Sequence, residues 1–170
     1  MSQLYAETTF VCLSYWLAEA FSDKGRSSFR YQYSVPLAIH GADMPGYFGP
    51  AAVTQGPDFE YAFMKIWGNF TTQDNPSIIA AIANGASSNN CQQTNPASTW
   101  PPFNIYAPYQ INLNETGGVP FSTPFGYENV TEYEGPGSRN DFTLVSAYTW
   151  EGGRGFRCDF WRSIAVTVPE

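Results

Sequence analysis

The feature that most constrains the fold is one strand-like segment near the N-terminus of the chain. Apolar and aromatic side chains alternate with polar ones from Phe29 to Val35, and Pro36 ends the run. Such period-2 alternation predicts a half-buried β-strand. A lone strand cannot satisfy its own backbone N–H and C=O groups, so this segment needs neighbours in a sheet.

Few other segments of the sequence are predicted to be strands that could pair with this one. Tyr109–Leu113 shows a shorter alternation, whereas residues 115–139 are rich in Gly, Pro and Thr and predict loops. Helical periodicity predicts helices at residues 13–21, 57–70, 76–82 and 157–166, the second of them opened by Pro57. The first helix has one apolar face, formed by Leu13, Trp16, Leu17, Ala20 and Phe21.

This combination of elements predicts an α/β fold with an incomplete sheet. Several helices and long loops accompany one clear strand, so much of the helical surface would lack a layer to cover. We expect residues 1–170 to form one flank of a larger α/β layer structure, with no separate second domain.

Charge and hydropathy exclude several classes of partner. The net charge of −7 and a pI near 4.5 argue against nucleic acid, whose phosphates need clustered Lys and Arg. No stretch approaches the ~20 apolar residues of a transmembrane helix, so no transmembrane segment is expected. Cys12, Cys91 and Cys158 have no metal-ligand spacing, and no metal is expected. In an oxidising compartment two of the cysteines would pair and one would remain.

Other features indicate a secreted protein. Asn69, Asn114 and Asn129 each begin an N-glycosylation acceptor triplet, although such triplets also arise by chance in Asn- and Thr-rich sequences. The first residues lack the basic start and apolar core of a signal peptide. The acceptor triplets and the missing signal peptide are both explained if these 170 residues are the C-terminal part of a longer secreted precursor.

His40 is the only histidine, and it follows the Phe29–Val35 strand in a turn. A histidine after a core strand suits the base of a nucleophile–histidine–acid hydrolase, but a lone histidine is more often structural. The serine motif G-x-S-x-G is absent from the sequence. Asp43 could orient His40 or cap the turn through backbone N–H groups, and the capping role is favoured.

Six motifs in order resemble the C-terminal part of type-B carboxylesterases, the α/β-hydrolase family that includes cholinesterases and secreted fungal lipases. Any one is weak, but their order is specific. They are the helix after Cys12, the strand at Tyr31–Tyr33, the histidine loop from Ile39 to Gly49, the helix ending Trp67–Phe70 with Asn75-Pro76, Trp100–Phe103, and Cys158–Trp161. The run Tyr148–Gly155 looks like the fungal branch.

The resemblance implies roles for individual residues. His40 would be the triad histidine, supported in its loop by Gly41 and Asp43, and Tyr47 and Phe48 would border an acyl pocket unless they only pack. Cys12 and Cys158 would form the family's C-terminal disulfide, which leaves Cys91 unpaired. No cofactor is implied.

The implied activity is hydrolysis of a small-molecule or lipid carboxylic ester by a serine esterase or lipase. The serine, the acid and the oxyanion-hole glycines of the family have no counterpart in this sequence, so we expect this chain to be inactive alone. The alternative is a non-catalytic esterase-like remnant or a secreted protein-interaction module. Which ester is cleaved is not encoded in these residues.

Overall fold

The computed structural model describes residues 2–22, 24–85, 89 and 92–167. Helices and two β-sheets make the chain α/β, as the sequence predicts. The chain divides into two compact units, each built from separate segments. One comprises Met1–Arg30, Pro101–Gln110 and Val145–Glu170, and the other comprises Tyr31–Trp100 and Ile111–Leu144.

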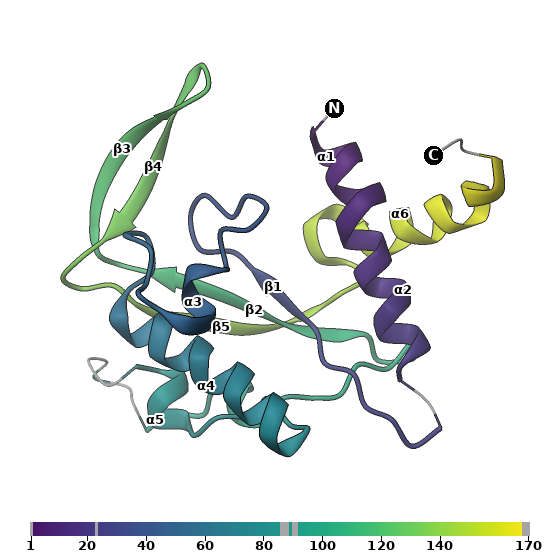
Figure 1. Cartoon of the computed structure of the whole chain (residues 1–170), viewed down its shortest axis with the longest axis horizontal. Helices are drawn as coiled ribbons and strands as arrows, with labels where there is room; N and C mark the ends of the chain where they lie inside the picture. The colour runs from purple at the N-terminus through teal and green to yellow at the C-terminus, as the bar shows by residue number, and fades with distance from the viewer. Residues whose placement is uncertain (1, 23, 86–88, 90–91, 168–170) are drawn as a thin grey trace. The chain divides into compact units, whose positions relative to one another are not determined.

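The first unit is built on helices. α1 (Ser2–Ala6), the π-helical η1 (Glu7–Val11) and α2 (Cys12–Ala20) follow one another without a break (Figure 1). The core of this unit is a cluster of small and aromatic side chains: Cys12, Tyr15, Ala18, Phe103, Ala147 and Cys158.

The apolar face identified from the sequence is not the buried face of α2. On it, Leu13, Leu17 and Phe21 are 50%, 61% and 49% exposed. The opposite face is buried instead, because Tyr15 donates its hydroxyl to the carbonyl of Ala147 and Cys12 lies in the core cluster. α2 is apolar on more than one side, and periodicity alone does not choose between two apolar faces.

The C-terminal helix of this unit begins earlier than predicted. α6 spans Trp150–Ile164, but residues 151–153 have positive φ, so regular helix starts at Arg154. A Cβ on Gly155 would lie 2.5 Å from Cα of Tyr148, and only glycine allows this close approach. The 3-10 helix η3 (Ala165–Thr167) follows.

The second unit contains the predicted strand and supplies its neighbour. β1 (Tyr31–Tyr33) pairs in parallel with β2 (Tyr109–Thr116), with Tyr31 opposite Ile111 and Tyr33 opposite Leu113. β5 (Arg139–Ser146) lies on the other side of β2, giving the strand order β1-β2-β5. One edge of β1 is therefore paired with β2 within this chain, and β1 is an edge strand of the sheet.

The prediction that residues 115–139 are loops is wrong. β3 (Val119–Phe125) and β4 (Glu128–Glu134) form an antiparallel hairpin that extends away from the three-stranded sheet (Figure 1). Val119 lies opposite Glu134 and Phe125 opposite Glu128. The sequence shows no period-2 pattern here, because β3 contains two prolines and both strands carry polar residues on both faces. The strands form nevertheless, since proline is tolerated where a strand edge is unpaired.

Helix α4 (Pro57–Gln73) packs on the sheet of this unit and confirms the predicted helix. Its buried residues are Phe59, Ala62, Phe63 and Ile66. The Phe59 ring lies 5.9 Å from that of Tyr33 on β1 and 5.8 Å from that of Phe142 on β5. Each ring buried this way contributes roughly 2–3 kcal/mol of stabilisation.

The remaining helices of this unit are short. They are α3 (Pro45–Phe48), α5 (Ala80–Ala83) and the 3-10 helix η2 (Pro96–Ser98). The predicted helix at 76–82 is shorter than expected, because the side chain of Asn75 accepts the N–H of Ser77 and forms a turn instead. Asn84 and Gly85 end α5 as predicted.

Candidate functional site

His40 lies at the tip of a turn that follows β1. The N–H of Ala42 donates to the carbonyl of Ile39 at 3.0 Å, so His40 and Gly41 are the two central residues of the turn. Gly41 has φ +83°, the positive value that a type II turn requires at its third position. The sequence His-Gly therefore fits the backbone geometry. In this turn the side chain of His40 is exposed.

The carboxylate of Asp43, the residue after this turn, accepts hydrogen bonds from two tyrosines. The hydroxyl of Tyr31 donates to its carboxylate at 3.3 Å, and that of Tyr47 donates to the same oxygen. The two tyrosine hydroxyls are 3.1 Å apart. The expectation that Asp43 caps the turn through backbone N–H groups is replaced by this network, which joins the histidine loop to β1 and α3.

The tyrosines of this network stay protonated over the physiological range. Burial and, to a lesser extent, the hydrogen bond to Asp43 together raise the pKa of Tyr47 to about 12. Burial likewise raises the pKa of Tyr31, and its hydrogen bond to Tyr47 acts in the same direction. Both hydroxyls are therefore neutral donors, and their role here is to fix the carboxylate of Asp43.

Gln55 makes a second link to the same loop and was not foreseen from the sequence. Its Nε2 donates to the hydroxyl of Tyr33 at 2.9 Å and to the carbonyl of Ala42 at 3.4 Å. The side chain is only 4% exposed. Gln55 lies in an irregular segment without periodicity, so no sequence signal marked it.

Tyr47 and Phe48, the predicted pocket wall, border an open depression against α4. Its other lining residues are Met64, Trp67, Gly68 and Thr71. The Tyr47 ring stacks on Phe63 at 5.2 Å and meets Trp67 edge-on at 5.0 Å, whereas Phe48 is 88% exposed. The two residues thus differ, since Tyr47 is packed and Phe48 projects outward.

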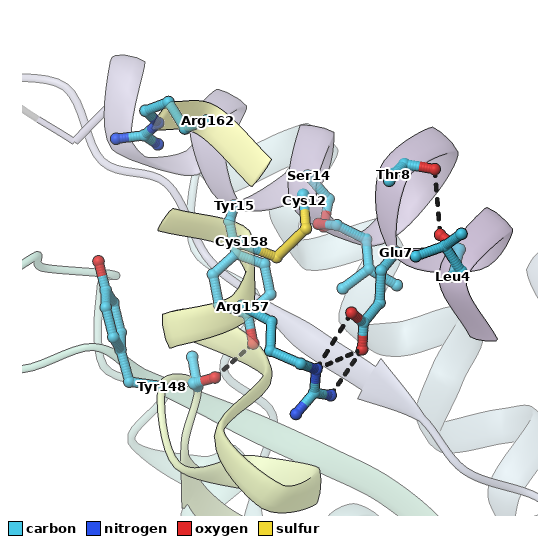
Figure 2. The surroundings of a disulfide bond; sticks show 12 residues. Leu4, Glu7, Thr8, Cys12, Ser14, Tyr15, Tyr148, Arg157, Cys158 and Arg162 are labelled. Carbon is cyan, nitrogen blue, oxygen red and sulfur yellow. Dashed lines mark hydrogen bonds and ion pairs between the residues drawn. A yellow bond between two sulfur atoms is a disulfide. The ribbon is translucent and has the colours of Figure 1, made fainter. Parts of the chain in front are cut away.

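The disulfide between Cys12 and Cys158 is present, as the resemblance implies (Figure 2). Both cysteines are buried, and their Cα atoms are 5.0 Å apart. Beside them Arg157 binds Glu7 through Nε and Nη2, at 2.9 and 2.6 Å, and lowers the pKa of that carboxyl. The bridge joins α2 to α6. Cys91 lies outside the described residues.

The three candidate glycosylation sites have different surroundings. Asn69 lies in α4 and donates its side-chain amide to the carbonyl of Ser77 at 2.7 Å. Asn114 lies in β2, with its side-chain oxygen buried. Asn129 on β4 is exposed, and of the three it is the one whose side chain an enzyme could reach.

Glu115 is a titratable residue that the sequence did not single out. Its carboxylate accepts the N–H of Gly56, at the start of α4, at 2.9 and 3.1 Å. Burial, aided by the nearby Asp58 and opposed by this hydrogen bond, raises the pKa of Glu115 to about 7. The folded protein therefore holds a proton at pH 5–6 that the unfolded chain releases.

Stability should fall with rising pH because of Glu115. The folded-state pKa is raised, so its stabilising contribution is complete below pH 4.5 and lost as the pH passes about 7. Relative to Glu115→Gln, we expect the free energy of unfolding to drop by about 2 kcal/mol between pH 5 and pH 8, allowing for partial exposure. Urea denaturation of both proteins at the two pH values measures this. A difference that does not vary with pH would contradict the prediction.

Metal clusters and membrane spans are absent from the described residues. No three His, Cys, Asp or Glu side chains gather there as metal ligands would, and no helix there combines the length and apolar character needed to cross a bilayer. No protein-family model, curated protein or solved structure matches the chain. The resemblance to type-B carboxylesterases therefore stays a prediction.

Proposed function

We propose that this chain is the histidine-bearing part of a serine carboxylic ester hydrolase. The observation that carries the proposal is the position of His40. It is exposed in the 39–42 turn, which follows β1 after the irregular residues 34–38, and β1 pairs in parallel with β2. In α/β folds reacting groups gather beyond the carboxyl ends of parallel strands.

The proposed chemistry gives His40 two successive tasks. As a base it takes the proton of a serine hydroxyl while the serine attacks the ester carbonyl, and as an acid it returns that proton to the departing alcohol. The serine and the acid that orients the imidazole lie outside residues 1–170 in this proposal. Asp43 is a poor candidate for that acid, because two tyrosine hydroxyls already occupy one of its oxygens.

The network around Asp43 supports a positioning role for the loop. A general base must lie within about 3 Å of the proton it takes, and a mobile loop would not keep it there. Tyr31 and Tyr47 bind Asp43, and Gln55 binds the carbonyl of Ala42, so the C-terminal side of the turn is held by three side chains. In this account Gly41 and Asp43 are positioning residues.

The proposed setting is extracellular, with a small-molecule or lipid ester as substrate and no nucleic acid as partner. A buried intramolecular disulfide is typical of proteins that fold in an oxidising compartment. The exposed acceptor residue Asn129 fits the same setting.

A second candidate function is non-catalytic binding of another protein. It is favoured by the apolar side chains that α2 leaves exposed, at Leu13, Leu17 and Phe21. Exposed apolar patches are typical of protein contact surfaces. The same exposure follows from the first proposal, because a further layer of a larger α/β structure would cover this face.

Hydrolysis of p-nitrophenyl esters by the full-length protein tests the proposal. We expect saturable release of p-nitrophenol near pH 8 that stops after treatment with an organophosphonate. Release no faster than the buffer rate, from protein with a cooperative unfolding transition, would contradict the enzyme assignment and favour the binding function.

A further inference from the structure

The β3-β4 hairpin has two outer strand edges. β3 and β4 form a sheet of their own, and among the described residues no third strand joins it. The hairpin extends away from the three-stranded sheet (Figure 1). A strand edge presents backbone N–H and C=O groups that can pair with another chain. A two-stranded ribbon is only marginally stable in water, so a third strand would stabilise it.

Proline blocks the outer edge of β3. Hydrogen-bonded and non-hydrogen-bonded residue pairs alternate along antiparallel strands, and residues of the second kind direct their backbone groups outward. Pro120 and Pro124 have no N–H, so they suit the outward positions, where no bond to β4 is lost. Ser122 lies midway between them and has the same phase. It is therefore the one outward position between the two prolines that can donate a hydrogen bond.

The outer edge of β4 has no such block. The residues opposite Pro120, Ser122 and Pro124 are Tyr133, Thr131 and Asn129. By the same alternation their backbone groups face outward, and each of the three has an N–H. All three residues are exposed. The hairpin thus has one edge closed by proline and one edge that can receive a strand.

Charge favours one kind of incoming strand. Residues 119–134 include Glu128, Glu132 and Glu134 but no Lys, Arg or His. Because every second residue of a strand lies on the same face, these three positions share one face of β4. A second copy of β4 pairing at this edge would set like charges opposite one another, which is unfavourable. A strand with Lys or Arg at alternate positions would be attracted instead.

We propose that the outer edge of β4 binds an extended basic segment of another protein as a third strand. Backbone hydrogen bonds along Asn129, Thr131 and Tyr133 would supply affinity, and alternate cationic side chains would supply selectivity. This interaction is separate from the exposed apolar face of α2. It needs no ester hydrolysis, so the hydrolase proposal and this one can fail independently.

Two synthetic peptides test the proposal. One alternates lysine with valine, and the other has glutamate in place of lysine. Each carries a fluorescent label, and its binding to the full-length protein is followed by anisotropy. An endoglycosidase first trims any glycan at Asn129, because a glycan there would crowd the edge. We expect saturable binding of the lysine peptide and binding weaker by about tenfold or more for the glutamate peptide.

Thr131→Pro is the decisive variant. It removes the central N–H of the β4 edge at an outward position, where the hairpin itself loses no bond. Binding of the lysine peptide should weaken by about tenfold or more. Thr131→Val keeps the N–H, and Ser122→Pro places the same ring on the opposite edge, so both variants should bind as the wild type does.

Glu128→Lys tests the role of charge while every backbone N–H stays in place. The position is exposed, so folding should be unaffected. The variant should bind the lysine peptide more weakly than the wild type and the glutamate peptide more tightly.

Any of four results would overturn the proposal. They are no binding of the lysine peptide, equal binding of the two peptides, equal binding by Thr131→Pro and Thr131→Val, or self-association of the full-length protein that Thr131→Pro abolishes. The third would indicate ionic adsorption without strand pairing, and the fourth would assign the edge to a second copy of the chain.

Discussion

Replacing His40 with alanine in the full-length protein should lower kcat for ester hydrolysis by about 10⁴-fold or more. The imidazole is the only one in the chain, and the proposal gives it both proton transfers of the reaction. KM should change little, because the imidazole acts on the serine and not on the bound ester. Steady-state kinetics with a p-nitrophenyl ester measures both quantities.

Two controls separate catalysis from structure in this experiment. Val53→Ala changes an exposed side chain of the same unit, 75% accessible, and should leave kcat unchanged. Added imidazole should restore part of the activity of His40→Ala, which a purely structural role would not allow. A fall of less than tenfold, or a loss that imidazole does not relieve, would argue against His40 as the base.

Removing the disulfide should cost the most stability of any small change. The bridge spans 146 residues, and closing a loop of this length stabilises by roughly 5 kcal/mol in the chain-entropy account. The double variant Cys12→Ala, Cys158→Ala should lose about this amount of unfolding free energy, with a further cost of about 1 kcal/mol for the emptied volume. Urea denaturation monitored by circular dichroism measures it.

Reduction supplies the matched comparison for the disulfide. Dithiothreitol should destabilise the wild type by a similar amount and leave the double variant unchanged, because that variant has no bridge to reduce. Since both cysteines are buried, reduction should require partial unfolding and be slow under native conditions. A double variant as stable as the wild type would show that the bridge contributes little.

Local signals predicted the second unit well where the chain has one apolar face. Pro57 fixes the start of α4, and apolar residues every three or four positions turn Phe59, Ala62 and Phe63 inward. The alternation from Phe29 to Val35 predicted a longer strand than the structure has, since β1 spans Tyr31–Tyr33. In α4 propensity and burial agree, so a short window of sequence is sufficient there.

Long-range contacts decided the elements that were predicted wrongly. α2 is apolar on two sides, and its inward face follows from contacts with Ala147 and Cys158, far along the chain. The β3-β4 hairpin is held by pairing between strands that individually resemble loops. Neither the choice of the buried face of α2 nor the pairing of β3 with β4 produces a periodic pattern of apolar residues within one segment.

In the candidate site, too, local features could be predicted from the sequence and contacts between distant segments could not. The turn at His40 and Gly41 could be predicted because a glycine at a position with positive φ is a local backbone requirement. The partners of Asp43 were not, because Tyr31 reaches it from β1 and Gln55 reaches the same loop from another segment. Glu115 contacts Gly56 from 59 positions away and could be found only in the folded chain.

Labelling with a fluorophosphonate tests the central claim most directly. Full-length wild-type and His40→Ala proteins are treated with the probe, and the modified residue is located by peptide mapping. The account predicts one labelled serine outside residues 1–170, and a labelling rate that falls in His40→Ala in proportion to kcat. Absence of a labelled serine, or equal rates in the two proteins, would contradict the assignment of His40 as the base of an ester hydrolase.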